Sequence, residues 1–333
     1  MARKHLKIKG LRPLSLALLL VSVPSLAQSP FRLADFAPGL GAALNPGSAS
    51  NHSHLESIRI SADLVLVPVT VTDALNRPQT NLVRDNFNVY EGNQPQLIRY
   101  FSNEDSPISV GLLLDISSSM QDKIDTERTA VEQFFKNANP EDDYFVITFN
   151  NRPRVLSDVT QSTEGIETEL GLVQPSGSTA LLDAVYLGLS KLRNAHYSRR
   201  ALVIISDGGD NSSRYKLREI KSLIAESDVM VYAIGIFGSG PFKSFEEAMG
   251  GRWLSSMTDV TGGKTTTIQD VTRLPEECAL LSRELRNQYV LGYRPSDRAA
   301  DGKWRKIKIT VTPPSDTDQL RPYYRRGYYA TTP

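Results

Sequence analysis

Between Ser109 and about Gln288 the sequence alternates short apolar runs with amphipathic segments, and this alternation constrains the fold more than any other feature. Four apolar runs of strand length lack strict alternation with polar residues, which is typical of strands buried on both faces. They cover residues 110–114, 144–149, 201–205 and 229–236. Strands that alternate with helices predict a doubly wound α/β fold, in which a mostly parallel sheet carries helices on both faces.

The amphipathic segments place apolar residues three or four positions apart, which is the period of one helix face. Three such stripes are Ile124, Val131 and Phe135; Leu181, Val185, Leu189 and Leu192; and Leu217, Ile220 and Ile224. A fourth stripe includes the one cysteine of the chain, Cys278, between Leu274 and Leu281. We therefore expect Cys278 to be a buried apolar side chain rather than a reactive thiol, and a single cysteine excludes an intramolecular disulfide.

The segments on either side of this region, residues 58–104 and 289–330, are rich in β-forming residues. The runs are 64–72, 87–90 and 97–101 on the first side, and 289–293, 307–312 and 327–329 on the second. Neither set is large enough for a stable domain, so we expect the two sets to pair into one small β-sandwich around the inserted α/β domain. Pro68 cannot donate a backbone hydrogen bond, which predicts that its strand lies at a sheet edge.

The first 27 residues resemble a signal peptide in composition, with basic residues, then an apolar run over 14–23, then the small residues Ser25 and Ala27. An uncleaved anchor is the alternative, but the run has about half of the roughly 20 residues that a membrane-spanning helix needs. Residues 28–57, rich in Ser, Pro, Gly, Ala and Asn, predict a flexible linker. We expect an exported protein that is periplasmic, secreted or on the cell surface, with no transmembrane segment after cleavage.

The overall charge is balanced, with 38 Lys and Arg residues against 37 Asp and Glu residues and a formal net charge of +1. A chain of this balance has no overall field to attract polyanions. We therefore expect no nucleic-acid partner.

Oxygen-bearing side chains gather where the predicted strands end. Asp115, Ser117 and Ser119 follow the first strand, Asp207 follows the third, and Thr179 stands just before the helix that begins near Ala180. Ligands of open α/β sheets bind outside the carboxyl ends of the strands, so these side chains should converge. Carboxylates and hydroxyls without His or Cys suit Mg²⁺ or Mn²⁺, while longer and more flexible contacts would admit Ca²⁺.

Three motifs in this set resemble the metal-ion-dependent adhesion site of von Willebrand factor type A domains. They are Asp115-x-Ser117-x-Ser119, Thr179 within Gly-Ser-Thr-Ala-Leu, and Asp207 within Ser-Asp-Gly, and the similarity covers about residues 105–288. The resemblance implies that Ser117 and Ser119 bind the ion directly and that the other three bind it directly or through water. It also implies that a carboxylate of the ligand fills the remaining position. The family often has Gly where this chain has Ser118.

The flanking strands resemble those of a group of exported bacterial proteins that carry this domain. The similar segments are Val71-Thr72-Asp73, residues 86–91 and residues 289–295. This second resemblance concerns architecture and implies no biochemical activity.

Ordinary structural roles compete with the metal role. The cluster from Asp115 to Ser119 would also serve as a helix N-cap, but Thr179 and Asp207 at their expected positions favour the metal site. Asp183 is interpreted as a carboxylate that stabilises the start of a helix, and Asp210 as a turn residue, rather than as ligands.

The expected function is metal-dependent binding of a protein or peptide that presents Asp or Glu, without catalysis. One alternative is a structural module of a cell-envelope assembly, and another is an enzyme, either a metal-assisted phosphoryl transferase or a serine hydrolase. Ser117 stands where the phosphatase would need a second Asp, and no Gly-x-Ser-x-Gly elbow occurs; His196 is interpreted as a solvated loop residue. The expected contacts to the partner are Met120, Gln121, Ser212, Arg214 and Tyr215.

Overall fold

The computed structural model describes residues 64–207, 209–237, 245–314 and 319–330. The predicted signal peptide and linker lie outside these residues. No helix in the described part of the chain has the length and apolar character needed to cross a membrane.

A six-stranded sheet forms the centre of the α/β domain, in the order β10-β9-β8-β5-β6-β7. Its strands are β5 (Ser109–Asp115), β6 (Asp143–Phe149), β7 (Pro153–Thr160), β8 (Arg200–Ser206), β9 (Met230–Ile236) and β10 (Thr265–Ile268). All neighbouring pairs are parallel except β6 and β7, which are antiparallel. The predicted α/β fold is therefore confirmed.

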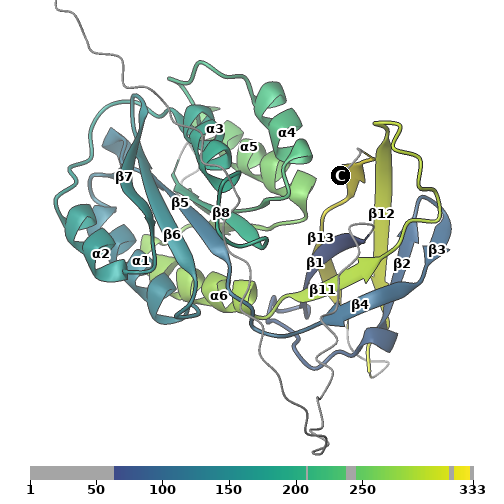
Figure 1. Ribbon diagram of the computed structural model, residues 1–333. Helices are drawn as coiled ribbons and strands as arrows, with labels where there is room; N and C mark the ends of the chain where they lie inside the picture. The colour runs from purple at the N-terminus through teal and green to yellow at the C-terminus, as the bar shows by residue number, and fades with distance from the viewer. Residues whose placement is uncertain (1–63, 208, 238–244, 315–318, 331–333) are drawn as a thin grey trace, which may run out of the picture. The chain divides into compact units, whose positions relative to one another are not determined.

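Helices cover both faces of this sheet (Figure 1). One face carries α1 (Ile124–Lys136), α2 (Thr163–Gly171) and α6 (Leu274–Arg286), and the other carries α3 (Leu181–Leu192), α4 (Leu217–Glu226) and α5 (Phe245–Thr261). Cys278 lies on the buried side of α6 with 1% of its surface exposed, and burial raises the pKa of its thiol. It is a core residue, as expected.

The connections leave the carboxyl ends of β5 and β8 toward opposite faces of the sheet. After β5 the chain continues into α1, which packs on one face, and after β8 it continues into α4, which packs on the other face. Adjacent parallel strands whose connections diverge to opposite faces leave room for a ligand between their ends. β5 ends at Asp115 and β8 ends at Ser206, directly before Asp207.

The remaining strands form two antiparallel sheets, ordered β13-β1-β11-β4 and β14-β12-β2-β3. Their bounds are β1 (Val65–Thr72), β2 (Phe87–Glu91), β3 (Gln94–Gln96), β4 (Ile98–Ser102), β11 (Tyr289–Tyr293), β12 (Trp304–Val311), β13 (Arg321–Tyr324) and β14 (Gly327–Tyr329). Side chains from both sheets share one apolar core, in which Val67, Val69 and Val71 of β1 are buried. Strands from before and after the α/β domain thus pair with each other.

The prediction that Pro68 marks an edge strand is wrong, because β1 lies between β13 and β11. The short β13 pairs only with Val69–Thr72 of β1. The ladder on that side therefore begins one residue beyond Pro68, and the proline is tolerated without a partner from β13.

Three short 3₁₀ turns complete the described secondary structure, at Arg84–Asn86, Ser118–Met120 and Val271–Arg273. The second of these directly follows β5 and shapes the candidate site.

Candidate metal site

The carboxylate of Asp115 is fixed at the end of β5 by two hydrogen bonds. Its side chain has 0% exposure. The backbone N–H of Ser117 donates to Oδ1 at 2.9 Å, and the hydroxyl of Ser206 donates to Oδ2 at 2.6 Å. Because Ser206 is the last residue of β8, these bonds tie the ends of the two strands together.

Hydroxyl groups connect Asp115 and its loop to Asp207. Ser117, 2% exposed, has its Oγ 3.1 Å from the Oγ of Ser119. Ser119 is exposed and donates to Oδ1 of Asp207 at 2.8 Å. Asp207 itself is 4% exposed. The structure thus brings four of the five predicted ligand residues into one hydrogen-bonded network.

Thr179 lies in a loop that contacts this network through the backbone. Its carbonyl accepts from the backbone N–H groups of Asn211 and Ser212, at 3.0 and 3.1 Å, and the residue is 6% exposed. The carbonyl of Gly177, two residues earlier, accepts from the N–H of Ser118 at 3.0 Å. Among the described residues, no hydrogen bond joins the Thr179 hydroxyl to the other four side chains.

Acidic side chains gather beneath the loop in a region of low solvent access. Burial raises the pKa of Asp115 to about 6, hydrogen bonds from Ser206 and Ser117 oppose this shift, and repulsion from Asp207 adds to it. Glu127 on α1 is 0% exposed, and burial, followed by repulsion from Asp115 and Asp207, raises its pKa well above the usual range. Neither carboxyl oxygen of Glu127 has a hydrogen-bond partner among the described residues.

Lys123 places a positive charge against this acidic group. Its ammonium donates to the carbonyl of Ser119 at 3.0 Å and forms a close ion pair with Oδ2 of Asp207. The sequence analysis missed Lys123, Glu127 and Ser206. Only Ser206 carried a usable signal, because it directly precedes Asp207 at a strand end.

The donor set fits a hard divalent cation. All five predicted ligands offer oxygen, and two carboxylates balance a charge of +2. Within the described ranges, no group of three or more His, Cys, Asp or Glu side chains is arranged to hold a metal. Such an ion would therefore depend on the serine and threonine hydroxyls, which excludes metals that prefer sulfur or nitrogen ligands.

Asp183 and Asp210 are both engaged in backbone hydrogen bonds. Asp210 accepts from the N–H of Leu182 at 2.8 Å, in the first turn of α3, and from that of Ser213 at 3.0 Å. Asp183 accepts from the N–H groups of Arg214 and Tyr215, at 2.9 and 3.2 Å. These bonds give both carboxylates a structural use.

The expected partner contacts divide into exposed and unexposed residues. Met120 is 0% exposed and belongs to the core beneath α1, so its expected contact with a partner is wrong. The 3₁₀ turn that begins at Ser118 directs its side chain inward. Gln121 and Arg214 are exposed, and the ring of Tyr215 stacks on Tyr186 with centroids 4.3 Å apart.

His196 lies at the other end of the sheet from the site. It is mostly exposed, stacks on Tyr197, and has its Nδ1 4.0 Å from Asp143, the first residue of β6. Asp115 pairs with Phe149, the last residue of β6. The imidazole is therefore not placed to act on a group bound at Asp115.

A family model described as von Willebrand factor type A domain matches residues 110–209 of the chain. No curated protein matches the sequence.

Solved structures resemble the chain at low identity. A von Willebrand factor type A protein from Catenulispora acidiphila is 12% identical with a TM-score of 0.48, covering 80% of this chain and 73% of that one. The PilB minor pilin from Streptococcus sanguinis is 12% identical with a TM-score of 0.46, covering 56% of this chain and 63% of that one. The VWA domain of SpRpn10 is 14% identical with a TM-score of 0.42, covering 53% of this chain and 97% of that domain.

Proposed function

The chain contains a von Willebrand factor type A domain, and we propose that this domain binds a divalent cation through which it captures a carboxylate of a protein partner. Mg²⁺ is the proposed ion, with Mn²⁺ or Ca²⁺ as substitutes. The proposed ligands are Asp115, Ser117, Ser119, Thr179 and Asp207.

The hydrogen-bonded network at the ends of β5 and β8 is the observation that carries this proposal. Four oxygen-bearing side chains from two loops meet there, and the two carboxylates among them are almost completely buried. Asp207 pairs with Lys123, whereas Asp115 has no ion pair among the described residues. A buried carboxylate without a cationic partner is costly, so a divalent ion at this place would lower the free energy of the folded state.

The chain's own residues hold the site ready for such an ion. The Ser117 N–H donates to one oxygen of the Asp115 carboxylate and the Ser206 hydroxyl donates to the other, so the carboxylate is held in one orientation. When bound, the ion supplies a positive centre for an incoming carboxylate oxygen. Neutral hydroxyls donate weakly to a metal and leave it with affinity for a further anionic ligand, so the site suits binding without turnover.

Export and adhesion belong to the same proposal. The basic and apolar N-terminal sequence supports export to the periplasm, the cell surface or the medium. A partner that presents Asp or Glu on a protein surface would then be met outside the cytoplasm. A structural role in an envelope assembly is the competing function, and it requires no metal.

Crosslinking capture from native exported fractions tests the proposal. The purified chain is used with Mg²⁺, with a chelator, and as an Asp115→Ala variant. We expect partners that are recovered with Mg²⁺ and lost in both other samples. Equal recovery in all three samples would contradict the proposal and favour the structural role.

A further inference from the structure

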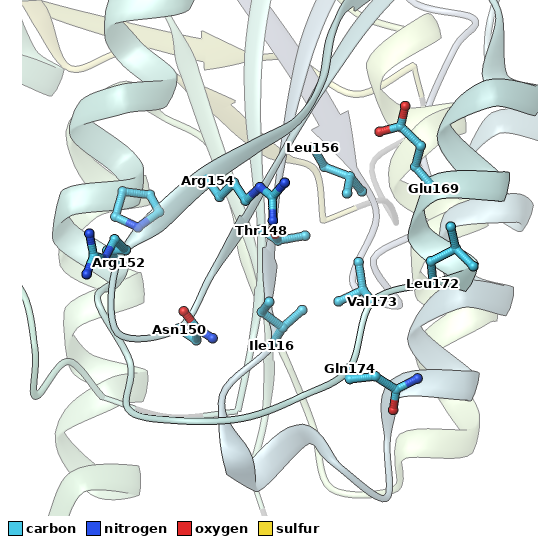
Figure 2. A pocket seen from close by; sticks show the side chains of 11 residues that line it. Ile116, Thr148, Asn150, Arg152, Arg154, Leu156, Glu169, Leu172, Val173 and Gln174 are labelled. Atoms are coloured by element: carbon cyan, nitrogen blue, oxygen red, sulfur yellow. The ribbon is translucent and has the colours of Figure 1, made fainter.

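A pocket of about 610 Å³ opens beside the candidate metal site, in the size range of ligand-binding pockets. Figure 2 shows it between two segments. On one side Arg152 precedes β7 and Arg154 lies at its start; on the other, Glu169 lies in α2 and Leu172 and Val173 in the loop that follows. Ile116 lies at its base.

The pocket and the candidate metal site share one loop. Ile116 lines the pocket and stands between Asp115 and Ser117, two of the proposed ligands. Its N–H donates to the carbonyl of Phe149 at 2.9 Å, and its carbonyl accepts from the N–H of Ser176 at 2.8 Å, so its position is fixed. Ile116 is the direct neighbour of both ligands along the chain. Because an extended peptide covers roughly 3.3 Å per residue, a few residues of a bound peptide are enough to span from the metal site to the pocket wall at Ile116.

Two unpaired arginines give the pocket its charge. Arg152 lies in the loop before β7 and Arg154 is the second residue of β7; both are exposed, and both line the pocket. In the part of the chain that the structure describes, neither guanidinium has an ion pair or a hydrogen bond, in contrast to Arg286, which pairs with Asp105. A guanidinium has donors in a planar fork that matches a carboxylate.

The wall opposite the arginines is apolar where the chain leaves α2, and hydrogen bonds from Arg128 fix its backbone. Leu172 is 79% exposed and Val173 is partly buried. Arg128 of α1 donates from Nη2 to the carbonyl of Val173 at 2.7 Å and from Nε to that of Leu170 at 3.2 Å. This wall is therefore a preformed surface against which an apolar side chain can pack, which lowers the cost of binding.

Glu169 limits where an acidic ligand group can sit. It lines the same wall as Leu172 and faces the pocket from the side opposite the arginines (Figure 2). Repulsion from Glu169 disfavours a second carboxylate on the α2 side, so such a group is directed to β7.

We propose that this pocket is a second recognition subsite for the same partner, and that the partner segment is a peptide with two acidic residues and an apolar residue between them. The first carboxylate binds at the metal site, the apolar side chain packs against Leu172 and Val173, and the second carboxylate pairs with Arg152 and Arg154. This inference rests on the proposed function, because the first contact is the metal-dependent one.

Calorimetry with synthetic peptides in saturating Mg²⁺ tests the inference on the purified full chain. One series carries two Glu residues separated by one to four residues that include a Leu. In the matched series the second Glu is replaced by Gln. The protein variants are Arg152→Gln with Arg154→Gln, and a control with the same charge loss, Arg193→Gln with Arg252→Gln, which replaces exposed arginines elsewhere.

We expect at least one spacing at which the peptide with two Glu residues binds about tenfold more tightly than its Gln counterpart. The Arg152→Gln, Arg154→Gln variant should lose this difference while its Mg²⁺ affinity and its melting temperature stay unchanged. The control variant should keep the difference.

The inference is overturned if no spacing gives a difference, or if the Arg152→Gln, Arg154→Gln variant keeps it. Failure of the proposed function has another signature: no peptide of either series then binds in a manner that depends on Mg²⁺.

Discussion

Lys123 is the residue whose charge most directly opposes a metal ion at the site, because its ammonium contacts both Asp207 and the carbonyl of Ser119. A divalent cation at the site must either displace this ammonium from Asp207 or bind more weakly because of electrostatic repulsion. We expect Lys123→Met to bind Mg²⁺ about three- to tenfold more tightly in isothermal titration calorimetry. Lys136→Met, an exposed substitution at the end of α1, is the control. Unchanged or weaker binding by Lys123→Met would show that Lys123 does not compete.

Glu127 makes stability depend on pH in a predictable direction. The pKa of Glu127 in the folded chain lies well above the value of 4.5 expected in the unfolded chain. The folded chain therefore holds this proton more tightly. The resulting stability is fully present below pH 4.5 and is lost as the pH rises through the folded-state pKa. Glutamine at this position stays neutral. With a chelator present, we expect Glu127→Gln to gain stability over the wild type as the pH rises from about 5 to about 8, reaching about 1–3 kcal/mol.

Melting temperatures of the two proteins across this range provide the measurement. Other buried acids, such as Asp142 and Glu284, also have raised pKa values, but they are common to both proteins and cancel in the difference. A difference that does not change with pH would mean that Glu127 has an ordinary pKa in the folded chain.

At the scale of elements, one arginine joins the start of the α/β domain, before β5, to its end, after α6. Arg199 precedes β8 and donates to the carbonyl of Ser106 in a close contact, to that of Leu285 at 2.6 Å, and to Oε1 of Gln288 at 3.3 Å. Residue 106 precedes β5, whereas 285 and 288 lie at and beyond the end of α6. A single side chain thus fixes the entry and the exit of the domain.

We expect Arg199→Met to lower the free energy of unfolding by about 2 kcal/mol or more, because hydrogen bonds to a charged donor are lost and carbonyls are left unpaired. Urea unfolding followed by circular dichroism measures this loss. The neighbouring Arg200→Met removes one bond, to the carbonyl of Tyr197, and should cost less. Equal midpoints for the two variants would contradict this role of Arg199.

The elements that could be predicted from the sequence are those with a strong apolar period. Strands β5, β6, β8 and β9 are buried throughout, so their composition alone revealed them. Strand β7 lies at the sheet edge and mixes charged and apolar residues, and β10 is three threonines followed by one isoleucine. Neither has a pattern that separates it from a loop. In α5 the buried Leu254 and Met257 form too short a stripe to predict a helix.

The residues of the candidate site also separate into those that the sequence predicts and those that it does not. Asp115 and Asp207 could be placed together because adjacent parallel strands end at one edge of a sheet. Lys123 and Glu127 reach the site only through the packing of α1, which no local pattern encodes. Met120 looked like a loop residue because its neighbours are polar, yet the turn after Ser118 buries it.

For the whole molecule, the pairing of the flanking strands means that neither flank can fold alone. Strand β1 pairs only with β11 and β13 within the described residues, β4 only with β11, and β2 with β12 and β3. A chain that ends at Gln288 would keep only the β2-β3 pair. We expect residues 64–102 of this shortened chain to be cleaved rapidly in limited proteolysis, whereas the full chain protects them. Equal protection would mean that the C-terminal strands are not required.

Isothermal titration calorimetry of Mg²⁺ into the purified chain tests the central claim most directly, because it reports the ion at the site without needing the partner. The wild type should bind about one Mg²⁺ per chain. The Asp115→Ala, Ser117→Ala double variant should not bind it. Ser118→Ala, which changes an exposed side chain in the same loop, should behave as the wild type. Equal binding by the wild type and the double variant would show that these loops do not hold the ion.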